Sequence, residues 1–242
     1  MGMRTRVLIL LLAASAAACS RPPTMDHAFN DPQLAPLADA ALRGDADALR
    51  AGLAAGINAD SPGADGTSLL QLAVAAGQPA AVEVLLDAGA DPNRQSPAGG
   101  SAVHAAAFGN DADILRILLA RGGDPDLRNS ATGETPLVRA ILGRGDAQVR
   151  MLLEAGADPG STDNNGGTPL HAAGSINAGA IVLMLLEAGA PAHATNSAGD
   201  SFQPYYFQLD AALLNPRARA EREAVVAWLR EHRVPLEAGV GE

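Results

Sequence analysis

Five histidines, one cysteine and a few carboxylate-rich turns are the groups in this 242-residue sequence whose types could do chemistry. His104 and His171 stand 67 residues apart, at the same place in two similar segments, so we do not expect them to share a metal ion. The run Asp163-Asn164-Asn165-Gly166 offers oxygen ligands, but it lacks the ligand spacing and the distal glutamate of an EF-hand calcium loop. We interpret this run as a turn.

Motifs that would support catalysis are missing from the sequence. It contains no Gly-x-Ser-x-Gly elbow, no GxxxxGK phosphate loop and no His-Glu-x-x-His zinc motif. We therefore expect no enzyme activity, no metal site and no cofactor. A cryptic enzyme remains the alternative, and turnover by the purified protein would be needed to support it.

Cys19 is the sole cysteine, so no disulfide can form within the chain. It follows a basic start with Arg4 and Arg6, an apolar run over residues 7–14, and small residues up to Ala18. This order is typical of a secretory signal peptide over residues 1–18. The apolar run is too short for a membrane span, and no later segment approaches the ~20 apolar residues that a span needs.

The segment Ala16-Ala17-Ala18-Cys19 resembles the bacterial lipobox, with Ala16 at the place where leucine is usual. This resemblance implies that Cys19 becomes the N-terminus and carries a diacylglycerol. Ser20 in place of aspartate implies, by resemblance to enterobacterial sorting, the periplasmic face of the outer membrane, while sorting to the inner membrane stays open. The alternative is an ordinary cleaved signal and a soluble periplasmic protein. We interpret residues 19–36, which are polar and contain prolines, as a lipid-anchored flexible tether.

Composition narrows the fold and the partners. The sequence is 48% hydrophobic and only 3% aromatic, and much of the hydrophobic share is alanine, which favours closely packed helices. The formal net charge is −10, and a chain this acidic repels nucleic-acid phosphates. We therefore expect no nucleic-acid partner.

The elements that would position any functional residue recur with a fixed period. Gly56, Gly89, Gly122, Gly156 and Gly189 each follow a leucine by three residues, and they are spaced by 33, 33, 34 and 33 positions. Before each of the last four glycines lies an apolar stretch with steps of three and four residues, which predicts an amphipathic helix. Earlier in the same units stand Thr-Pro-Leu-His at 168–171 and its variants at 135–138, 101–104 and 68–71.

These shared features resemble the ankyrin repeat from Leu37 to about Asp200. The resemblance implies an all-α solenoid of stacked helix-turn-helix units with β-hairpin loops. We expect about five repeats, near 37–60, 61–93, 94–126, 127–160 and 161–193, because single units cannot bury their apolar faces alone. Residues 201–242 would form irregular C-terminal capping helices and a short tail. We place the aromatic residues of this cap in its core rather than at an interface: Phe202, Tyr205, Tyr206 and Phe207.

The resemblance also assigns local roles. Thr135 and Thr168 can cap the first helix of their units, with proline at the first helical position. His104 and His171 would hydrogen-bond within and between repeats. Between the two helices the family commonly has glycine, and here Asn110, Asn177 and Arg144 occupy three of these slots. Asparagine tolerates a left-handed turn, and at Arg144 we expect the flanking glycines at 143 and 145 to absorb the strain.

The resemblance implies a concave face that binds protein, and the residues that the repeat leaves free are the candidate contacts. Arginines and aromatic side chains are the usual anchors of protein interfaces. On the inner helices the candidates are Phe108, Arg139 and Ile176, and at the loop tips they are Arg94, Gln95, Arg128, Asn129 and Asn164.

We therefore predict a monomeric, protein-binding lipoprotein that holds a protein partner at the bacterial envelope. It resembles exported ankyrin proteins that act as immunity or accessory proteins for a secreted lipase effector. Others of that kind support a periplasmic enzyme such as catalase, which gives the alternative of a structural or stress-related lipoprotein. A spacer of the envelope without a specific client is a further alternative.

Overall fold

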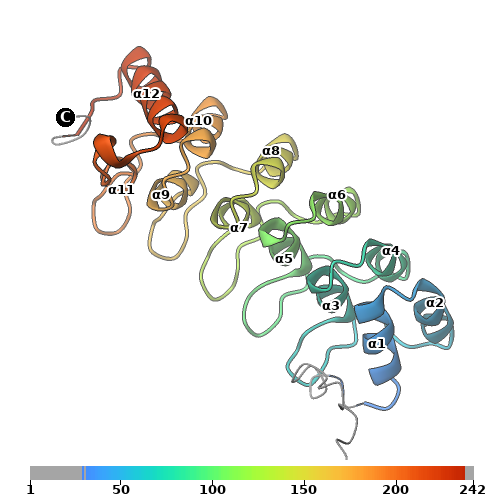
Figure 1. The fold of residues 1–242 in the computed structure, drawn as a ribbon. Helices are drawn as coiled ribbons and strands as arrows, with labels where there is room; N and C mark the ends of the chain where they lie inside the picture. The colour runs from blue at the N-terminus through green and yellow to red at the C-terminus, as the bar shows by residue number, and fades with distance from the viewer. Residues whose placement is uncertain (1–28, 30, 238–242) are drawn as a thin grey trace, which may run out of the picture.

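The computed structural model describes residue 29 and residues 31–237, and its regular structure in this range is helical. Figure 1 shows an elongated stack of two parallel rows of helices, with loops projecting from one side. The inner row, beside the loops, consists of α1 (Ala35–Arg43), α3 (Leu69–Ala75), α5 (Ala102–Phe108), α7 (Pro136–Leu142), α9 (Pro169–Ser175) and α11 (Gln203–Tyr206). The outer row consists of α2 (Ala46–Ala54), α4 (Pro79–Asp87), α6 (Ala112–Ala120), α8 (Asp146–Glu154), α10 (Gly179–Glu187) and α12 (Pro216–Glu231).

The N-terminal predictions fall outside this description. The signal peptide, Cys19 and the first part of the tether lie among residues that the structure does not describe. For its last part the tether prediction is wrong, because Phe29 and Leu34 are buried and α1 begins at Ala35. Among the described residues, no helix has the length and apolar character needed to cross a membrane.

The predicted β-hairpins are loops without strands in the part of the chain that the structure describes, apart from one bridge between Pro62 and Ser68. Each loop is closed at its base by a main-chain hydrogen bond, such as Ser96 N–H to the Gly100 carbonyl at 2.9 Å. Four of these bonds span four positions, but the bond from Asn129 to Glu134, at 2.8 Å, spans five. The extra residue of the 34-residue step is therefore absorbed in this loop, and the helices keep their register.

Helix starts follow the expected chemistry at three of four central repeats. Ser68, Ser101 and Thr168 each begin an inner helix with a capping box, in which the third helical residue bonds back to the cap. Thr135 is the exception, because its buried hydroxyl has no hydrogen-bond partner among the described residues. The third residue of α7 is Val138, which has no polar group to complete the box.

The turns between paired helices show whether the residues that replace glycine adopt the predicted left-handed conformation. Arg144 and Asn177 adopt φ values of 56° and 52°, as expected for residues that replace glycine there. The strain is not taken up by the glycines beside Arg144, since Gly143 has φ −73° and Gly145 has φ −88°. The prediction for Asn110 is wrong, because Asn110 is not among the positive-φ residues. Gly109 leaves α5 in an extended conformation and its carbonyl accepts a hydrogen bond from Gln148 Nε2 at 2.7 Å.

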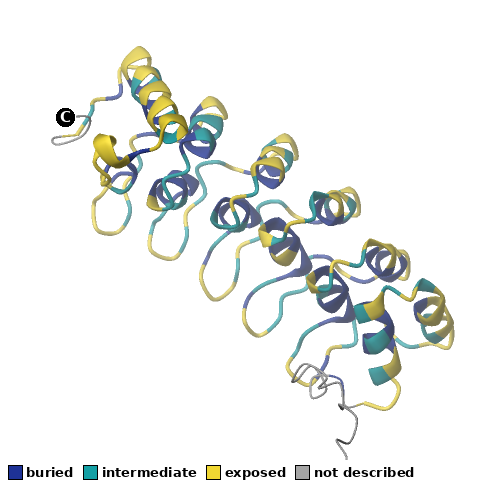
Figure 2. Cartoon of the chain, in the orientation of Figure 1, coloured by how far each residue is buried: buried dark blue, intermediate teal, exposed yellow. Residues whose placement is uncertain are grey.

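A continuous core runs along the stack between the two rows of helices (Figure 2). One small residue recurs at the same place in four successive inner helices and is buried in each: Ala73, Ala106, Ala140 and Ala173. Because these side chains are only methyl groups, the neighbouring helices can pack closely. Leucines such as Leu85, Leu118 and Leu152 fill the space from the outer row and are fully buried.

The C-terminal end departs from the repeat, with α11, a 3-10 helix over Ala211–Leu213, and the longer α12. Phe202, Tyr206 and Phe207 are buried in the core of this end, while Tyr205 is half-buried. The guanidinium of Arg222 on α12 donates to the Leu209 carbonyl at 2.7 Å and lies 5.5 Å from the Phe207 ring centre. Arg222 thus fixes the chain that connects the last two helices.

Candidate protein-binding surface

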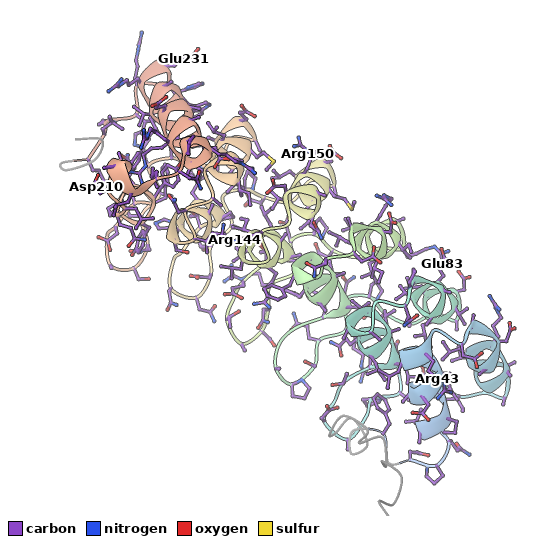
Figure 3. The ribbon with its side chains drawn as sticks, viewed as in Figure 1. Arg43, Glu83, Arg144, Arg150, Asp210 and Glu231 are labelled. Atoms are coloured by element: carbon purple, nitrogen blue, oxygen red, sulfur yellow. The ribbon has the colours of Figure 1, made fainter. Side chains whose placement is uncertain are left out.

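The exposed side of the inner helices forms a surface that we call the inner face. It lies beside the loops, whereas Glu83 and Arg150 mark the opposite, outer row (Figure 3). Its exposed and half-buried members come from the fourth and seventh positions of α5, α7 and α9 and from the seventh position of α3: Ala75, Ala105, Phe108, Arg139, Leu142, Ala172 and Ser175.

Phe108 and Arg139, two of the predicted contacts, are brought together at the middle of the inner face. The Arg139 guanidinium lies over the Phe108 ring at 4.5 Å from its centre. Phe108 belongs to α5 and Arg139 to α7, so the pair joins two repeats. The ring is 47% exposed, and it is one of only three large hydrophobic side chains with high exposure among the described residues. Its repeat position elsewhere holds Ala75, Leu142 and Ser175.

Glu134 completes this arrangement and was not predicted from the sequence. Its Oε2 atom lies 3.6 Å from Arg139 Nη1, and both side chains are mostly buried. Arg139 is therefore held between a carboxylate and an aromatic ring. A side chain held in this way loses little conformational freedom on binding, which favours its use as an anchor.

The predicted contact residue Ile176 lies at the end of α9 and is half-buried against the core. Its carbonyl accepts a hydrogen bond from Arg144 Nη2 at 2.6 Å. The structure does not bring Ile176 into the Phe108–Arg139 pair.

Three loop-tip residues of the predicted set connect neighbouring loops. Gln95 Nε2 donates to the Arg128 carbonyl at 2.6 Å, and Arg128 Nη1 donates to the Thr162 carbonyl. Asn164 Nδ2 donates to the Ala131 carbonyl at 3.1 Å. These side chains order the row of loops, and a direct role in binding stays a prediction for them.

The remaining two loop-tip residues of the predicted set are Asn129 and Arg94. Asn129 Oδ1 accepts from the main-chain N–H groups of Ala131 and Thr132, at 2.9 and 3.1 Å, and so shapes its own loop. Arg94 is half-buried, and its buried Nε atom has no hydrogen-bond partner in the part of the chain that the structure describes. Its carbonyl accepts from Gln71 Nε2 at 3.4 Å.

A second ladder of loop contacts was not predicted from the sequence. Asp60, Asn93 and Asp126 each accept a hydrogen bond from a main-chain N–H group of the following repeat, at 2.8–2.9 Å. The ladder stops at Gly160, which has no side chain to accept, and the facing residue is Pro191, which has no N–H to donate. The common frame position of these residues is the signal that could have revealed the ladder.

The two repeat histidines hold the loops against the inner helices. His104 Nδ1 lies 2.9 Å from Ser101 Oγ, and its Nε2 donates to the Glu134 carbonyl at 3.2 Å. His171 Nε2 donates to the Asp200 carbonyl at 2.9 Å. Burial lowers the pKa of His104, the hydrogen bond to the Glu134 carbonyl opposes this effect, and the Arg139 charge lowers the pKa further. His104 is therefore neutral near pH 7 and serves the fold.

Two shallow hollows lie on the inner face, one on each side of Glu134. One has a volume of about 410 Å³ and is lined by residues of α3 and α5 together with Asn129 and Arg139. The other has a volume of about 280 Å³ and lies between α7 and α9. Within the described range, no group of three or more His, Cys, Asp or Glu side chains could hold a metal ion. The inner face thus offers an apolar and charged surface suited to contact with another molecule.

Comparison with known proteins identifies the repeat. A family model described as "Ankyrin repeats (3 copies)" matches residues 101–196, and one described as "Ankyrin repeats (many copies)" matches residues 70–119. The chain is similar to the solved ankyrin repeat domain of Bcl-3, "a unique member of the IkappaB protein family". The two are 26% identical with a TM-score of 0.70, and the match covers 88% of this chain and 90% of that one. A search of curated protein sequences found no match.

Proposed function

Because this chain is built from ankyrin repeats, we propose that it acts by binding another protein through its inner face, with Phe108 and Arg139 at the centre of the contact. The observation that carries this proposal is the exposed ring of Phe108 under a fixed guanidinium, at 4.5 Å. A partner that covers this ring would remove its apolar surface from water, which favours association. Arginine and aromatic residues also supply most of the binding energy in many interfaces.

The surroundings of the pair suit a contact of this kind. The neighbouring inner-face residues Ala75, Ala105 and Ala172 are small, so a partner could approach the helices closely. The loops that border the inner face are fixed to one another by the side chains of Gln95, Arg128 and Asn164. A preorganised surface binds with a smaller entropic cost than a mobile one.

The proposed setting is the envelope of a bacterium. In this proposal Cys19 carries the lipid, and the tether is the part of residues 19–36 that precedes the folded chain, since Phe29 and Leu34 are buried and α1 begins at Ala35. The repeats face the periplasm from the outer membrane as a monomer. The support is the order of basic, apolar and small residues that precedes Cys19. Without lipidation, the same signal would yield a soluble periplasmic protein.

Within that setting we favour an immunity or accessory role for a secreted lipase effector. The alternative is support of a periplasmic enzyme such as catalase. Both rest on the resemblance to exported ankyrin proteins and require only a binding surface. A gene for a lipase effector beside this gene would favour the first role, and an oxidative-stress gene would favour the second.

Photo-crosslinking in the native bacterium tests the binding role. A photoreactive amino acid replaces Phe108 in one variant and Arg150, on the outer row, in a matched control. The proposal predicts one abundant protein adduct from position 108 and none from position 150. Equal adducts from both positions, or none from position 108, would reject the inner face as the binding surface.

The anchor is tested separately with a labelled fatty acid. The parent chain should incorporate the label and fractionate with the outer membrane, and Cys19→Ser should do neither. Incorporation of the label by Cys19→Ser would contradict the lipoprotein assignment while leaving the binding role intact.

A further inference from the structure

In three of the four central repeats, the third residue of the inner helix makes the same hydrogen bond. Gln71, His104 and His171 each donate a hydrogen bond to the carbonyl that ends the next loop, at 2.8, 3.2 and 2.9 Å. In the fourth repeat the third helical residue is Val138, which has no donor. The interaction that the other repeats make is therefore absent between α7 and the loop that leads to α9.

The missing donor leaves an acceptor with spare capacity. The carbonyls of Gly100, Glu134 and Asp200 each accept two hydrogen bonds, one from their own loop and one from the preceding inner helix. Among the described residues, the equivalent Gly167 carbonyl accepts only one, from Asp163 N–H at 2.9 Å. A carbonyl oxygen has two lone pairs, so one more donor can be accommodated.

Space is present at the same place. Val138 is shorter than histidine or glutamine, and the hollow of about 280 Å³ lies over it. Val138, Leu142 and Ala172 form the apolar part of this hollow, which we call the Val138 pocket. Glu134, Gly167 and His171 are among the other residues that line it.

Two carboxylates give the pocket its charge. Glu134 lines it and lies 3.6 Å from Arg139, which is too long for a strong hydrogen bond. Asp163 also lines it, and one of its oxygens, Oδ1, accepts from the N–H groups of Asn165 and Gly167 at 2.7 and 2.8 Å. The second oxygen of Asp163 makes no hydrogen bond within the described residues. An apolar floor with carboxylate oxygens at the rim matches a side chain with an aliphatic stem and a cationic head.

We propose that the Val138 pocket binds a lysine or arginine side chain of the protein partner. The stem lies on Val138, Leu142 and Ala172, and the head donates to the Gly167 carbonyl and to the carboxylates of Glu134 and Asp163. The formal net charge of −10 favours a basic partner at longer range. This inference rests on the proposed binding role of the inner face, and it specifies the chemistry that the partner presents there.

The test uses two small probes on the full chain in detergent micelles, N-acetyl-lysine methylamide and N-acetyl-norleucine methylamide, which keeps the aliphatic stem and lacks only the ammonium group. Methyl NMR signals of Leu142 and Ala172 report on the pocket, and the methyl signal of Ala105, in the other hollow, is the control. We expect the lysine probe to shift the pocket signals with roughly tenfold higher affinity than norleucine, since a hydrogen bond to a charged group contributes about that much. The Ala105 signal should not shift.

Two variants separate the pocket from other causes. Val138→His copies His104 and His171, so it should fill the pocket, keep the fold and abolish the shifts caused by lysine. The double variant Glu134→Gln with Asp163→Asn keeps the shape of the pocket and removes its charges. It should lower the affinity for the lysine probe to that for the norleucine probe. Equal shifts by both probes, or lysine binding that survives in both variants, would overturn the inference. Loss of the crosslink at Phe108 is a different result and would instead reject the proposed function.

Discussion

The guanidinium of Arg139 on α7 lies 4.5 Å from the ring centre of Phe108 on α5, so the most exposed aromatic ring of the inner face is covered by a charge from the next repeat. The same guanidinium faces Glu134 at 3.6 Å. The solenoid brings these residues together because each repeat places its inner helix beside the next. A surface of this type can be fixed before a partner arrives.

The contact between Phe108 and Arg139 should be measurable as a coupling energy. Phe108→Ala, Arg139→Ala and the double variant form a cycle, and we expect a coupling of about 0.5–1 kcal/mol, the usual value for an exposed cation–π pair. Urea unfolding of the full chain in detergent provides the measurement. Additive effects of the two substitutions would show that the pair has no energetic role.

Lowering the pH should lower the free energy of unfolding because of His104. Its pKa in the folded chain lies below the ordinary value of 6.5, mainly because the ring is buried. As the pH falls below 6.5 the unfolded chain therefore takes up a proton more readily than the folded chain, and stability is lost until the folded pKa is reached. Urea unfolding at pH 7.5 and pH 5.5 should show this loss.

The matched variant for this effect is His104→Gln, which copies the hydrogen-bonding residue Gln71 of the preceding repeat. It should lose less stability than the parent between the two pH values, because glutamine does not titrate. An identical pH dependence in the two proteins would show that His104 does not cause it.

The ladder of loop contacts should contribute to stability at Asn93. Its side chain accepts from Asp124 N–H at 2.8 Å and donates to the Gly122 carbonyl at 2.9 Å. Asn93→Ala should lower the free energy of unfolding by about 1–2 kcal/mol, the net contribution of two such bonds. Arg150→Ala, an exposed substitution on the outer row, should change it by less than about 0.5 kcal/mol. Equal effects would argue against the ladder.

The C-terminal end should depend on Arg222, which is only 8% exposed. Arg222→Met removes the donor to the Leu209 carbonyl, and a loss of about 2–3 kcal/mol is expected for a buried bond to a charged group. Hydrogen exchange of α12 amides should rise in this variant and stay unchanged in Arg230→Met, whose side chain is exposed. Unchanged exchange in Arg222→Met would show that the end holds together without this contact.

The sequence was sufficient to predict the repeat, because a 33-residue period and the Thr-Pro-Leu-His frame are local features. It was also sufficient to predict the left-handed turn at Asn177. The turn at Asn110 was not predictable, since the conformation of Gly109 depends on a hydrogen bond from Gln148 in the next repeat. Interactions that cross repeats require the stacking distance, which no single unit contains.

The candidate surface, too, could be predicted from the sequence only in part. Phe108 and Arg139 could be selected from residue type and helix position, but their contact depends on how α5 and α7 stack. The place of Glu134 depends on the loop with the extra residue. Gln95, Arg128 and Asn164 were expected to be free, and they contact the neighbouring loop instead. The Val138 pocket did have a sequence signal, because valine stands where the other central repeats have glutamine or histidine.

The most direct test of the central claim is to measure, by titration calorimetry, how tightly the full chain binds the partner that crosslinking identifies. Arg139→Glu reverses the charge at the centre of the inner face, while Arg150→Glu makes the same change on the outer row. Loss of an interface anchor typically costs 2 kcal/mol or more, so the account predicts that Arg139→Glu weakens binding by roughly thirtyfold or more and that Arg150→Glu leaves it unchanged. Unchanged affinity in Arg139→Glu would contradict the inner face as the binding surface.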